Sequence, residues 1–289
     1  MMPPEHRPPV EAQHLDAMLP QEIARTAEEV GVRKANLDLL SLFTLAVLAG
    51  AFIAFGAIFS TVVAAGAQDL PFGVVRLLSG TVFSLGLILV IVGGAELFTG
   101  NAIIVMAWAA RRIPTVRLVR NWGVVFVGNL VGGVGTAAIN VAAGQYKMGG
   151  GAVGQTALKI AEAKCALPFS EALALGVLCN TLVCLAVWLC LGTRSTSGRI
   201  LAIVFPIAAF VASGFEHSIA NMYFIPVGLF VKYLGASSFW QASGLAPADF
   251  PSLTLEGFVM NLVPVTIGNV IGGGVLVSLV YWFVYLRRR

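Results

Sequence analysis

The sequence predicts an all-α membrane protein with six transmembrane helices, arranged as two related halves of three helices each. The composition, six long apolar segments and two pairs of matching motifs support this fold class. Of the 289 residues, 58% are hydrophobic and only 11% are charged, and the mean hydropathy is +0.88. A soluble chain of this length needs far more polar residues to cover its surface, so these values indicate an integral membrane protein.

Six apolar segments are long enough to cross a bilayer, whose hydrocarbon core of about 30 Å requires roughly 20 helical residues. The first segment is uncharged for much longer than the apolar core of a signal peptide, so it is expected to stay in the protein. The segments span residues 39–67, 77–110, 122–146, 172–191, 200–231 and 258–286.

The second and fifth segments each contain a charged residue in the middle of apolar sequence. The motifs are GGAELFTGN at 93–101 and SGFEHSIAN at 213–221, and a glycine, a glutamate and an asparagine have the same spacing in both. A charged side chain inside the membrane is costly and usually serves a function. Paired, interrupted spans mark a pathway near the middle of the bilayer, so we expect the second and fifth helices to be interrupted.

A second pair of motifs supports a duplication. GNLVGG at 128–133 in the third segment returns as GNVIGG at 268–273 in the sixth. Because three spans per half is an odd number, the two halves must have opposite orientations, which predicts a 3+3 inverted repeat. The glycines of these motifs are expected to let neighbouring helices pack closely.

The distribution of positive charge predicts the orientation in the membrane. Thirteen of the 18 Lys and Arg residues lie in the N-terminal tail, in the connections after the second and fourth segments, and at the C-terminus. Because cytoplasmic loops are enriched in Lys and Arg, both termini are expected in the cytoplasm. This topology accounts for the net charge of +4, and no nucleic-acid partner is expected.

Residues 1–37 are expected to form a cytoplasmic tail with a short amphipathic helix, ahead of a six-helix transmembrane domain at 38–289. The first 13 residues are Pro-rich and polar, which predicts a mobile tail. Residues 14–32 are compatible with a weakly amphipathic helix that ends at Gly31 and lies at the cytoplasmic interface. A partly ordered linker is the alternative interpretation of this stretch.

The second charged motif contains His217, the only histidine beyond residue 14. An ordinary histidine pKa near 6.5 makes it the side chain that changes charge around neutral pH, so it is a candidate for binding an ion or moving a proton. Glu96 and Glu216 are expected to accept hydrogen bonds from the half-helix N-termini exposed at the breaks. Exposed N–H groups that no carboxylate caps would attract an anion.

Two further polar residues are candidates. Asn180 lies deep in the fourth segment, where a buried amide needs a hydrogen-bond partner. Lys164 lies in the loop before that segment, where a lysine is usually just solvated. At the mouth of an anion pathway, however, it would raise the local anion concentration. Additional hydrogen bonds are expected from Thr99, Asn101, Ser218 and Asn221.

Several function classes are not supported by the sequence. The chain lacks GxxxxGK[ST], so ATP-driven pumping by this chain alone is not expected. It also lacks HExxH, GxSxG and paired His/Cys ligands, so no enzyme activity, metal or cofactor is expected. Three of the four cysteines lie in the fourth segment and are interpreted as small apolar side chains. A receptor or scaffold would be expected to carry a sizeable soluble domain, which the pattern does not predict.

Three motifs in order, GGAELFTGN, GVLCNTLVCLAVWL at 176–189 and SGFEHSIANMYFIP at 213–226, resemble the formate/nitrite transporter family, most closely its formate branch. The likeness extends from about residue 23 to NLVPVTIGNVIGGG at 261–274 and departs mildly at Thr181, where the family usually has an apolar residue. The resemblance implies an aquaporin-like six-helix protomer in a homopentamer, with one pathway per protomer, in a bacterial cytoplasmic (inner) membrane.

The resemblance also implies roles for individual residues. His217 would contact the permeating monovalent anion, with Thr99 and Asn180 nearby, Glu216 beside the histidine and Lys164 in the outer vestibule. Apolar constrictions above and below that site would be formed by Phe83, Leu87, Leu97, Phe98 and Phe210.

Together these features predict a bidirectional channel or transporter for formate and related small weak-acid anions, with protons and the lipid bilayer as further partners. An apolar constriction is costly for a bare anion and much less so for the neutral acid. Transport is therefore expected to be proton-coupled when His217 supplies a proton and channel-like when it does not. Nitrite, hydrosulfide and short monocarboxylates such as acetate and lactate are alternative substrates. A neutral-solute channel is less favoured, because the chain lacks two Asn-Pro-Ala motifs.

Overall fold

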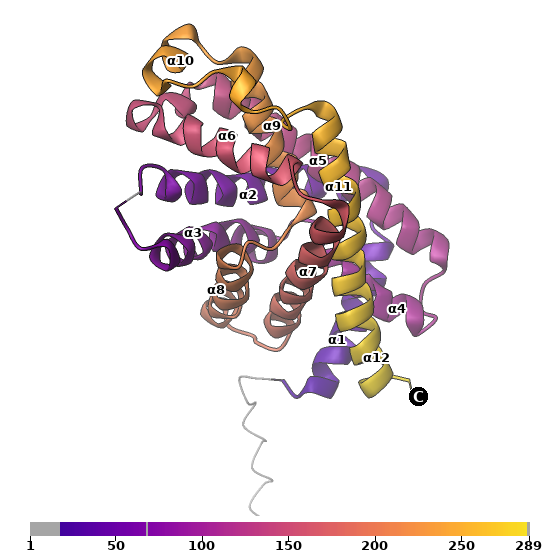
Figure 1. The fold of residues 1–289 in the computed structure, drawn as a ribbon. Helices are drawn as coiled ribbons and strands as arrows, with labels where there is room; N and C mark the ends of the chain where they lie inside the picture. Colours follow the sequence, from indigo (N-terminus) through magenta and orange to yellow (C-terminus); the bar gives the residue numbers. More distant parts are fainter. Residues whose placement is uncertain (1–17, 68, 288–289) are drawn as a thin grey trace, which may run out of the picture.

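The computed structural model describes residues 18–67 and 69–287, which form helices joined by turns, without a β-strand (Figure 1). The long helices are α2 (Leu39–Ala64), α3 (Phe72–Gly93), α5 (Thr115–Ala142), α7 (Phe169–Leu191) and the continuous run of α11 (Leu255–Val270), η5 (Ile271–Leu279) and α12 (Val280–Tyr285). The shorter helices are α1 (Pro20–Ala35), α4 (Val105–Ala109), α6 (Ala152–Cys165), α8 (Thr196–Ala212), α9 (Ser218–Leu234) and α10 (Ser237–Ser243). Short 3-10 segments are η1 (Gly100–Ile104), η2 (Gln145–Lys147), η3 (Gly149–Gly151) and η4 (Pro247–Asp249).

Among the described residues, five helices are long and apolar enough to cross a membrane, or six when α9 and α10, bent by 104°, are counted as one span. The predicted all-helical, multi-pass architecture is confirmed. The third span begins earlier than the sequence predicts, at Thr115 rather than at residue 122. The first turns of α5 are polar, and a side-chain bond ties them to the segment between α1 and α2. Arg120 Nη1 donates to the backbone oxygen of Leu37 at 3.0 Å.

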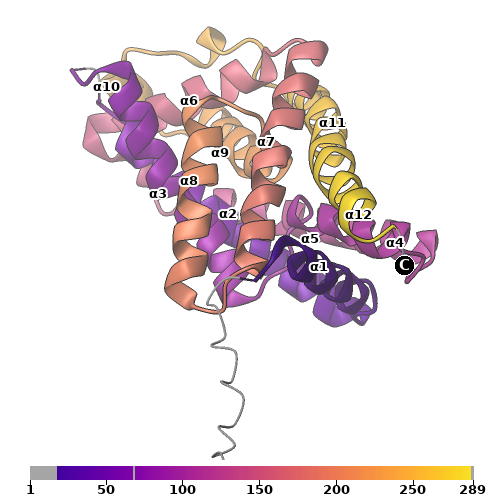
Figure 2. The same ribbon diagram turned by 90° about the horizontal axis from the view of Figure 1, so that it is seen from below.

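Several of the shorter helices lie at the two ends of the molecule. Helix α1, α12 and the C-terminus lie at one end, here called the α1 end, and α6 and α10 lie at the opposite end, the α6 end (Figure 1). Viewed from below, α1 lies in front of the bundle (Figure 2). Helix α9 runs through the interior, and its residues 218–229 and 231 are all buried. A helix that is buried on every side belongs to the core of a bundle.

The second and fifth spans are interrupted, as the charged motifs predict. Helix α3 ends at Gly93, and the chain turns through Gly94, with φ of 82°, before η1. Helix α8 ends at Ala212, and the chain turns through Gly214, with φ of 75°, before α9. This left-handed conformation is strained for other residues, which explains the glycine in both motifs.

The predicted amphipathic helix near the N-terminus is present as α1, and its apolar face packs against the bundle. The predicted end at Gly31 is wrong, because α1 continues to Ala35. Gly31 is instead a point of close contact, where a Cβ atom would lie 3.0 Å from that of Ala107. The predicted mobile tail at 1–13 and the predicted start of the helix lie outside the described residues.

The glycines of GNLVGG and GNVIGG bring two pairs of helices into backbone contact. A Cβ atom on Gly132 of α5 would overlap the carbonyl oxygen of Val47 in α2. In the other half, a Cβ atom on Gly272 of η5 would overlap the carbonyl oxygen of Val177 in α7. The predicted role of these glycines in close helix packing is confirmed.

We expect Gly132→Ala to lower the thermal stability of the detergent-purified protein, because the added methyl group must push α2 away from α5. Overpacking of this kind costs about 1–3 kcal/mol. Gly123→Ala is the matched control, since it lies in the same helix with no heavy atom within 4 Å of the added group. Equal melting temperatures for the two variants would contradict the role of Gly132.

Candidate functional site

His217 lies in the break of the fifth span, directly before α9, and is only 3% exposed. Its Nδ1 accepts a hydrogen bond from the backbone N–H of Ala220 at 3.0 Å, so the imidazole caps the first turn of α9. Because a backbone amide can only donate, Nδ1 carries a lone pair in this arrangement. The ring is therefore neutral, with its proton on Nε2.

The Nε2 of His217 faces the break of the second span, where Thr99 Oγ1 lies 2.9 Å away. The side chain of Asn180 in α7 donates to the backbone oxygens of Thr99 at 3.3 Å and Asn269 at 2.6 Å. The structure thus brings His217, Thr99 and Asn180 together in the buried interior. The prediction that the Asn180 amide needs a partner holds for its Nδ2, whereas its buried Oδ1 has no hydrogen-bond partner among the described residues.

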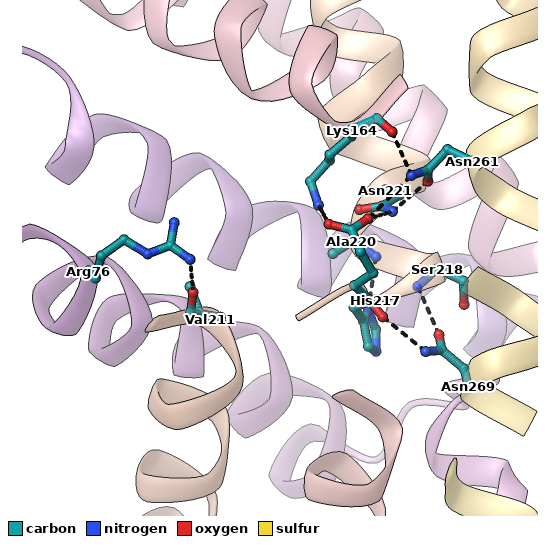
Figure 3. Close-up of polar contacts among 10 residues, drawn as sticks. Arg76, Lys164, Val211, His217, Ser218, Ala220, Asn221, Asn261 and Asn269 are labelled. Carbon is teal, nitrogen blue, oxygen red and sulfur yellow. Dashed lines mark hydrogen bonds and ion pairs between the residues drawn. The ribbon is translucent and has the colours of Figure 1, made fainter. Parts of the chain in front are cut away.

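The carboxylate beside His217 is neutralised by a lysine and accepts a hydrogen bond from an asparagine. Glu216 Oε1 lies 2.7 Å from Lys164 Nζ, and Oε2 accepts a bond from Asn221 Nδ2 at 2.6 Å (Figure 3). Asn261 completes the network, since it accepts a bond from Asn221 and donates to the backbone oxygen of Lys164. A buried carboxylate is tolerated when it is paired and hydrogen-bonded in this way.

The glutamates do not cap the half-helices, so this prediction is wrong. The imidazole of His217 caps α9, and Asn269 Oδ1 accepts a bond from the N–H of Ser218 at 2.9 Å. In the second span, Asn129 Oδ1 accepts a bond from the N–H of Phe98 at 2.9 Å. The carboxylates bind lysines instead, because a full positive charge makes a stronger hydrogen bond with a carboxylate than a backbone amide does.

The same set of bonds surrounds Glu96 near the α1 end. Its Oε1 lies 2.7 Å from Lys34 Nζ, and its Oε2 accepts a bond from Asn101 Nδ2 at 2.7 Å. Asn121 accepts a bond from Asn101 and donates to the backbone oxygen of Lys34. Each of these bonds has a counterpart in the network around Glu216, so the two breaks are supported in the same way.

Two further asparagines hold the breaks from the third and sixth spans. Asn129 and Asn269 donate to the backbone oxygens of Glu96 and Glu216, each at 3.0 Å. Sequence reasoning misses them because it assigns a role to the glycines of GNLVGG and GNVIGG and none to the asparagine between them. The sequence repeat could have identified them, because residues that recur at the same place in both halves bond to equivalent groups. By the same comparison of the two halves, the sequence could also have identified Lys34, Asn121 and Asn261.

A cavity of about 320 Å³ lies between α2, α3, α6, α8 and α9, on the side of the α6 end. Five predicted site residues form part of its wall: Phe83, Lys164, Phe210, Glu216 and His217. The other five do not line this cavity and are buried elsewhere: Leu87, Leu97, Phe98, Thr99 and Asn180.

Three aromatic rings line the cavity on the side of His217. The centroid of the Phe210 ring lies 5.8 Å from that of His217 and 5.7 Å from that of Phe83. Phe83 also stacks on Phe224, with centroids 6.3 Å apart. In such an apolar environment a hydrogen bond from His217 is stronger than it would be in water. The arrangement therefore suits the binding of one small polar molecule next to Nε2.

Phe98, which with Leu97 is a predicted constriction residue in the break of the second span, packs toward α5. Its ring centroid lies 5.1 Å from that of Phe126 and 6.1 Å from that of Trp122. The ring thus covers the α5 side of the break.

Comparison with known proteins identifies relatives over nearly the whole chain. The family model described as formate/nitrite transporter matches residues 21–283. The formate channel FocA of Escherichia coli strain K12 is 46% identical over 273 residues, which is 94% of this chain and 96% of the relative. The formate channel FocA of Haemophilus influenzae is 38% identical over 263 residues, which is 91% of this chain and 93% of the relative.

Solved structures share the fold. A pentameric formate channel with formate bound superposes with a TM-score of 0.82 at 44% identity, over 86% of this chain and 98% of that chain. An ion channel of the FNT family superposes with a TM-score of 0.75 at 30% identity, over 91% of this chain and 98% of that chain. The resemblance predicted from three sequence motifs is confirmed, and this chain belongs to the formate/nitrite transporter family, whose members are channels and transporters rather than enzymes.

Proposed function

We propose that this chain is a bidirectional formate channel or transporter of a bacterial cytoplasmic membrane, assembled as a homopentamer with one pathway in each protomer. The observation that carries the proposal is the neutral His217, whose Nε2 faces Thr99 where the two interrupted spans meet. Support comes from formate channels among the relatives and from the similar pentameric channel that holds formate.

The substrate takes the place of the Thr99 hydroxyl as acceptor of the bond from His217 Nε2. A carboxylate such as formate has two acceptor oxygens, so it can bind His217 and the freed Thr99 hydroxyl together. Asn180 keeps Thr99 in place through the backbone oxygen of that residue. The cavity beside Lys164 serves as the outer vestibule that leads to this site.

Apolar side chains on either side of His217 favour a neutral permeant. A bare anion loses its hydration between apolar groups at a high free-energy cost, and the protonated weak acid loses much less. We assign this role to the predicted constriction residues, all of them buried: Phe83, Leu87, Leu97, Phe98 and Phe210.

The capping bond of His217 restricts how a proton reaches the substrate. A neutral imidazole that gave up its Nε2 proton would become an anion, which is strongly unfavourable in this apolar site. Protonation of Nδ1 would instead break its bond with the N–H of Ala220 and leave the first turn of α9 uncapped. Proton-coupled transport through His217 therefore requires a rearrangement at the start of α9, whereas channel-like flux leaves the cap intact.

The α1 end faces the cytoplasm in this proposal, with both termini on that side, as the positive-inside rule favours. The chain is a 3+3 inverted repeat in which residues 1–37 precede a channel domain at 38–289. The matching bonds around Glu96 and Glu216 support this arrangement. They also tie α1 to the channel domain, because Lys34 belongs to α1 and pairs with Glu96.

We expect His217→Phe to reduce formate uptake into proteoliposomes across an imposed pH gradient by about tenfold or more, since hydrogen bonds to charged groups contribute about 1.5–3 kcal/mol. His217→Asn should retain more activity, because asparagine caps helices well and still offers an N–H donor. Proton-dependent uptake by the Phe variant at the wild-type rate would contradict the proposal.

Substrate choice is tested by competition for uptake of labelled formate. Unlabelled formate is expected to inhibit at lower concentrations than nitrite, hydrosulfide, acetate or lactate. Glycerol should cause no swelling of the same proteoliposomes, because the aromatic rings around His217 exclude a polyol whose hydroxyl groups find no partners. Stronger inhibition by one of the other anions would reassign the substrate, and rapid swelling in glycerol would favour a neutral-solute channel.

The ion pair of Lys164 and Glu216 is expected to behave as one unit in a double-mutant cycle. Glu216→Gln and Lys164→Met should each lower the melting temperature. Lys164→Met leaves the buried Glu216 carboxylate unpaired, and Glu216→Gln leaves the partly buried Lys164 without its carboxylate. The double variant should lose less than the sum of the two single losses. Additive losses would show that the two charges do not stabilise each other.

A further inference from the structure

The outer cavity is lined by two positively charged side chains, Lys164 and Arg76. The charge of Lys164 is balanced, because its Nζ lies 2.7 Å from the carboxylate of Glu216. Among the residues that the structure describes, no carboxylate oxygen lies within 4.0 Å of a guanidinium nitrogen of Arg76. The ion pairs found among these residues are Lys34–Glu96, Arg112–Glu28 and Lys164–Glu216. The uncompensated positive charge of the cavity therefore belongs to Arg76.

Arg76 is held in one orientation by the end of α8. Its Nη2 donates to the backbone oxygen of Val211 at 2.5 Å (Figure 3). Its Nε donates to the backbone oxygen of Ala212 at 2.9 Å. These acceptors are neutral carbonyls at a helix C-terminus, so they stabilise the cation and leave its charge in place. A guanidinium has five N–H donors, and those not used here have no hydrogen-bond partner among the described residues. The guanidinium also lies over the ring of Phe72, with its Cζ 5.9 Å from the ring centroid.

A second group in the same wall points to a ligand. Ser79 lies one helical turn beyond Arg76 on α3, lines the cavity and is only 6% exposed. Its Oγ has no hydrogen-bond partner among the described residues. A buried hydroxyl left without a partner destabilises the protein, and an anion that accepted its hydrogen bond would recover this cost. Arg76, Ser79 and Phe83 share one face of α3, so this stripe leads from the charged residue to the aromatic rings at His217.

We propose that Arg76 and Ser79 form an entry site for the substrate anion in the outer vestibule, ahead of His217. Arg76 supplies the attraction, Ser79 donates a hydrogen bond, and Lys164 holds Glu216 rather than the anion. The ligand is a small monovalent carboxylate or an oxyanion of similar size. This inference rests on the proposed formate transport and adds the residues that capture the anion from outside.

The test uses initial rates of labelled formate uptake by cells that express the full-length chain at matched levels. Arg76→Gln is expected to raise the half-saturating formate concentration about tenfold, the lower end of the effect of electrostatic focusing, with a smaller change in the maximal rate. Ser79→Ala should raise the half-saturating formate concentration about twofold to fivefold, because one hydrogen bond to the anion is lost. Added salt of a large, non-permeant anion should weaken the affinity of the wild type and leave that of Arg76→Gln nearly unchanged.

Two controls separate capture of the anion from a structural role. Arg76→Lys keeps the charge and loses the fixed two-pronged contact with α8, so its half-saturating concentration and salt dependence should stay close to those of the wild type. Lys147→Gln removes one positive charge from an exposed residue that does not line the cavity, and it should have no effect.

The outcomes distinguish this inference from the proposed function. Absence of formate uptake by the wild type would overturn the proposed function itself. If the wild type transports formate and Arg76→Gln has the same half-saturating concentration, the entry site is overturned and the function stands. Equal losses in Arg76→Lys and Arg76→Gln would also overturn it, because Arg76 would then act only by holding the end of α8.

Discussion

The neutralisation of two buried carboxylates, Glu96 and Glu216, is the constraint on which the rest of the structure depends. Each lies where a membrane span is interrupted, and an interrupted helix inside an apolar protein exposes polar groups that water cannot satisfy. Lysines from α1 and α6 supply the opposite charges. This explains why two short helices that are not among the membrane-spanning ones belong to the fold, and why asparagines from the third and sixth spans are buried at the breaks.

Neutralisation also shapes the chemistry of the site. Because Lys164 and Glu216 balance each other, the surroundings of His217 carry little net charge, and the imidazole itself is held neutral by its bond with Ala220. Such a site binds through hydrogen bonds between apolar walls more than through charge. It therefore suits a weak acid that changes its protonation state on the way through, and in our proposal the anion is captured farther out, at Arg76.

The two halves share a supporting framework and differ in the residue that follows each glutamate. Leu97 follows Glu96, whereas His217 follows Glu216. The second break therefore gains a side chain that caps the next helix, while η1 in the first break begins without a side-chain cap. Matching sets of bonds thus support both breaks, and the difference at one position provides a single imidazole where the breaks meet.

The sequence by itself determined the membrane class, the apolar segments, the two breaks and the family, because these follow from local composition and from motifs within short stretches. It identified Asn180 as an amide in need of a partner, and His217 as the titratable group. Only the tertiary structure decided that Glu216 pairs with Lys164 and that His217 caps α9 and faces Thr99. It also decided that no carboxylate within the described residues pairs with Arg76. These facts depend on contacts between residues far apart in the chain, such as the 118 positions between Thr99 and His217, and local pattern carries no information about such contacts.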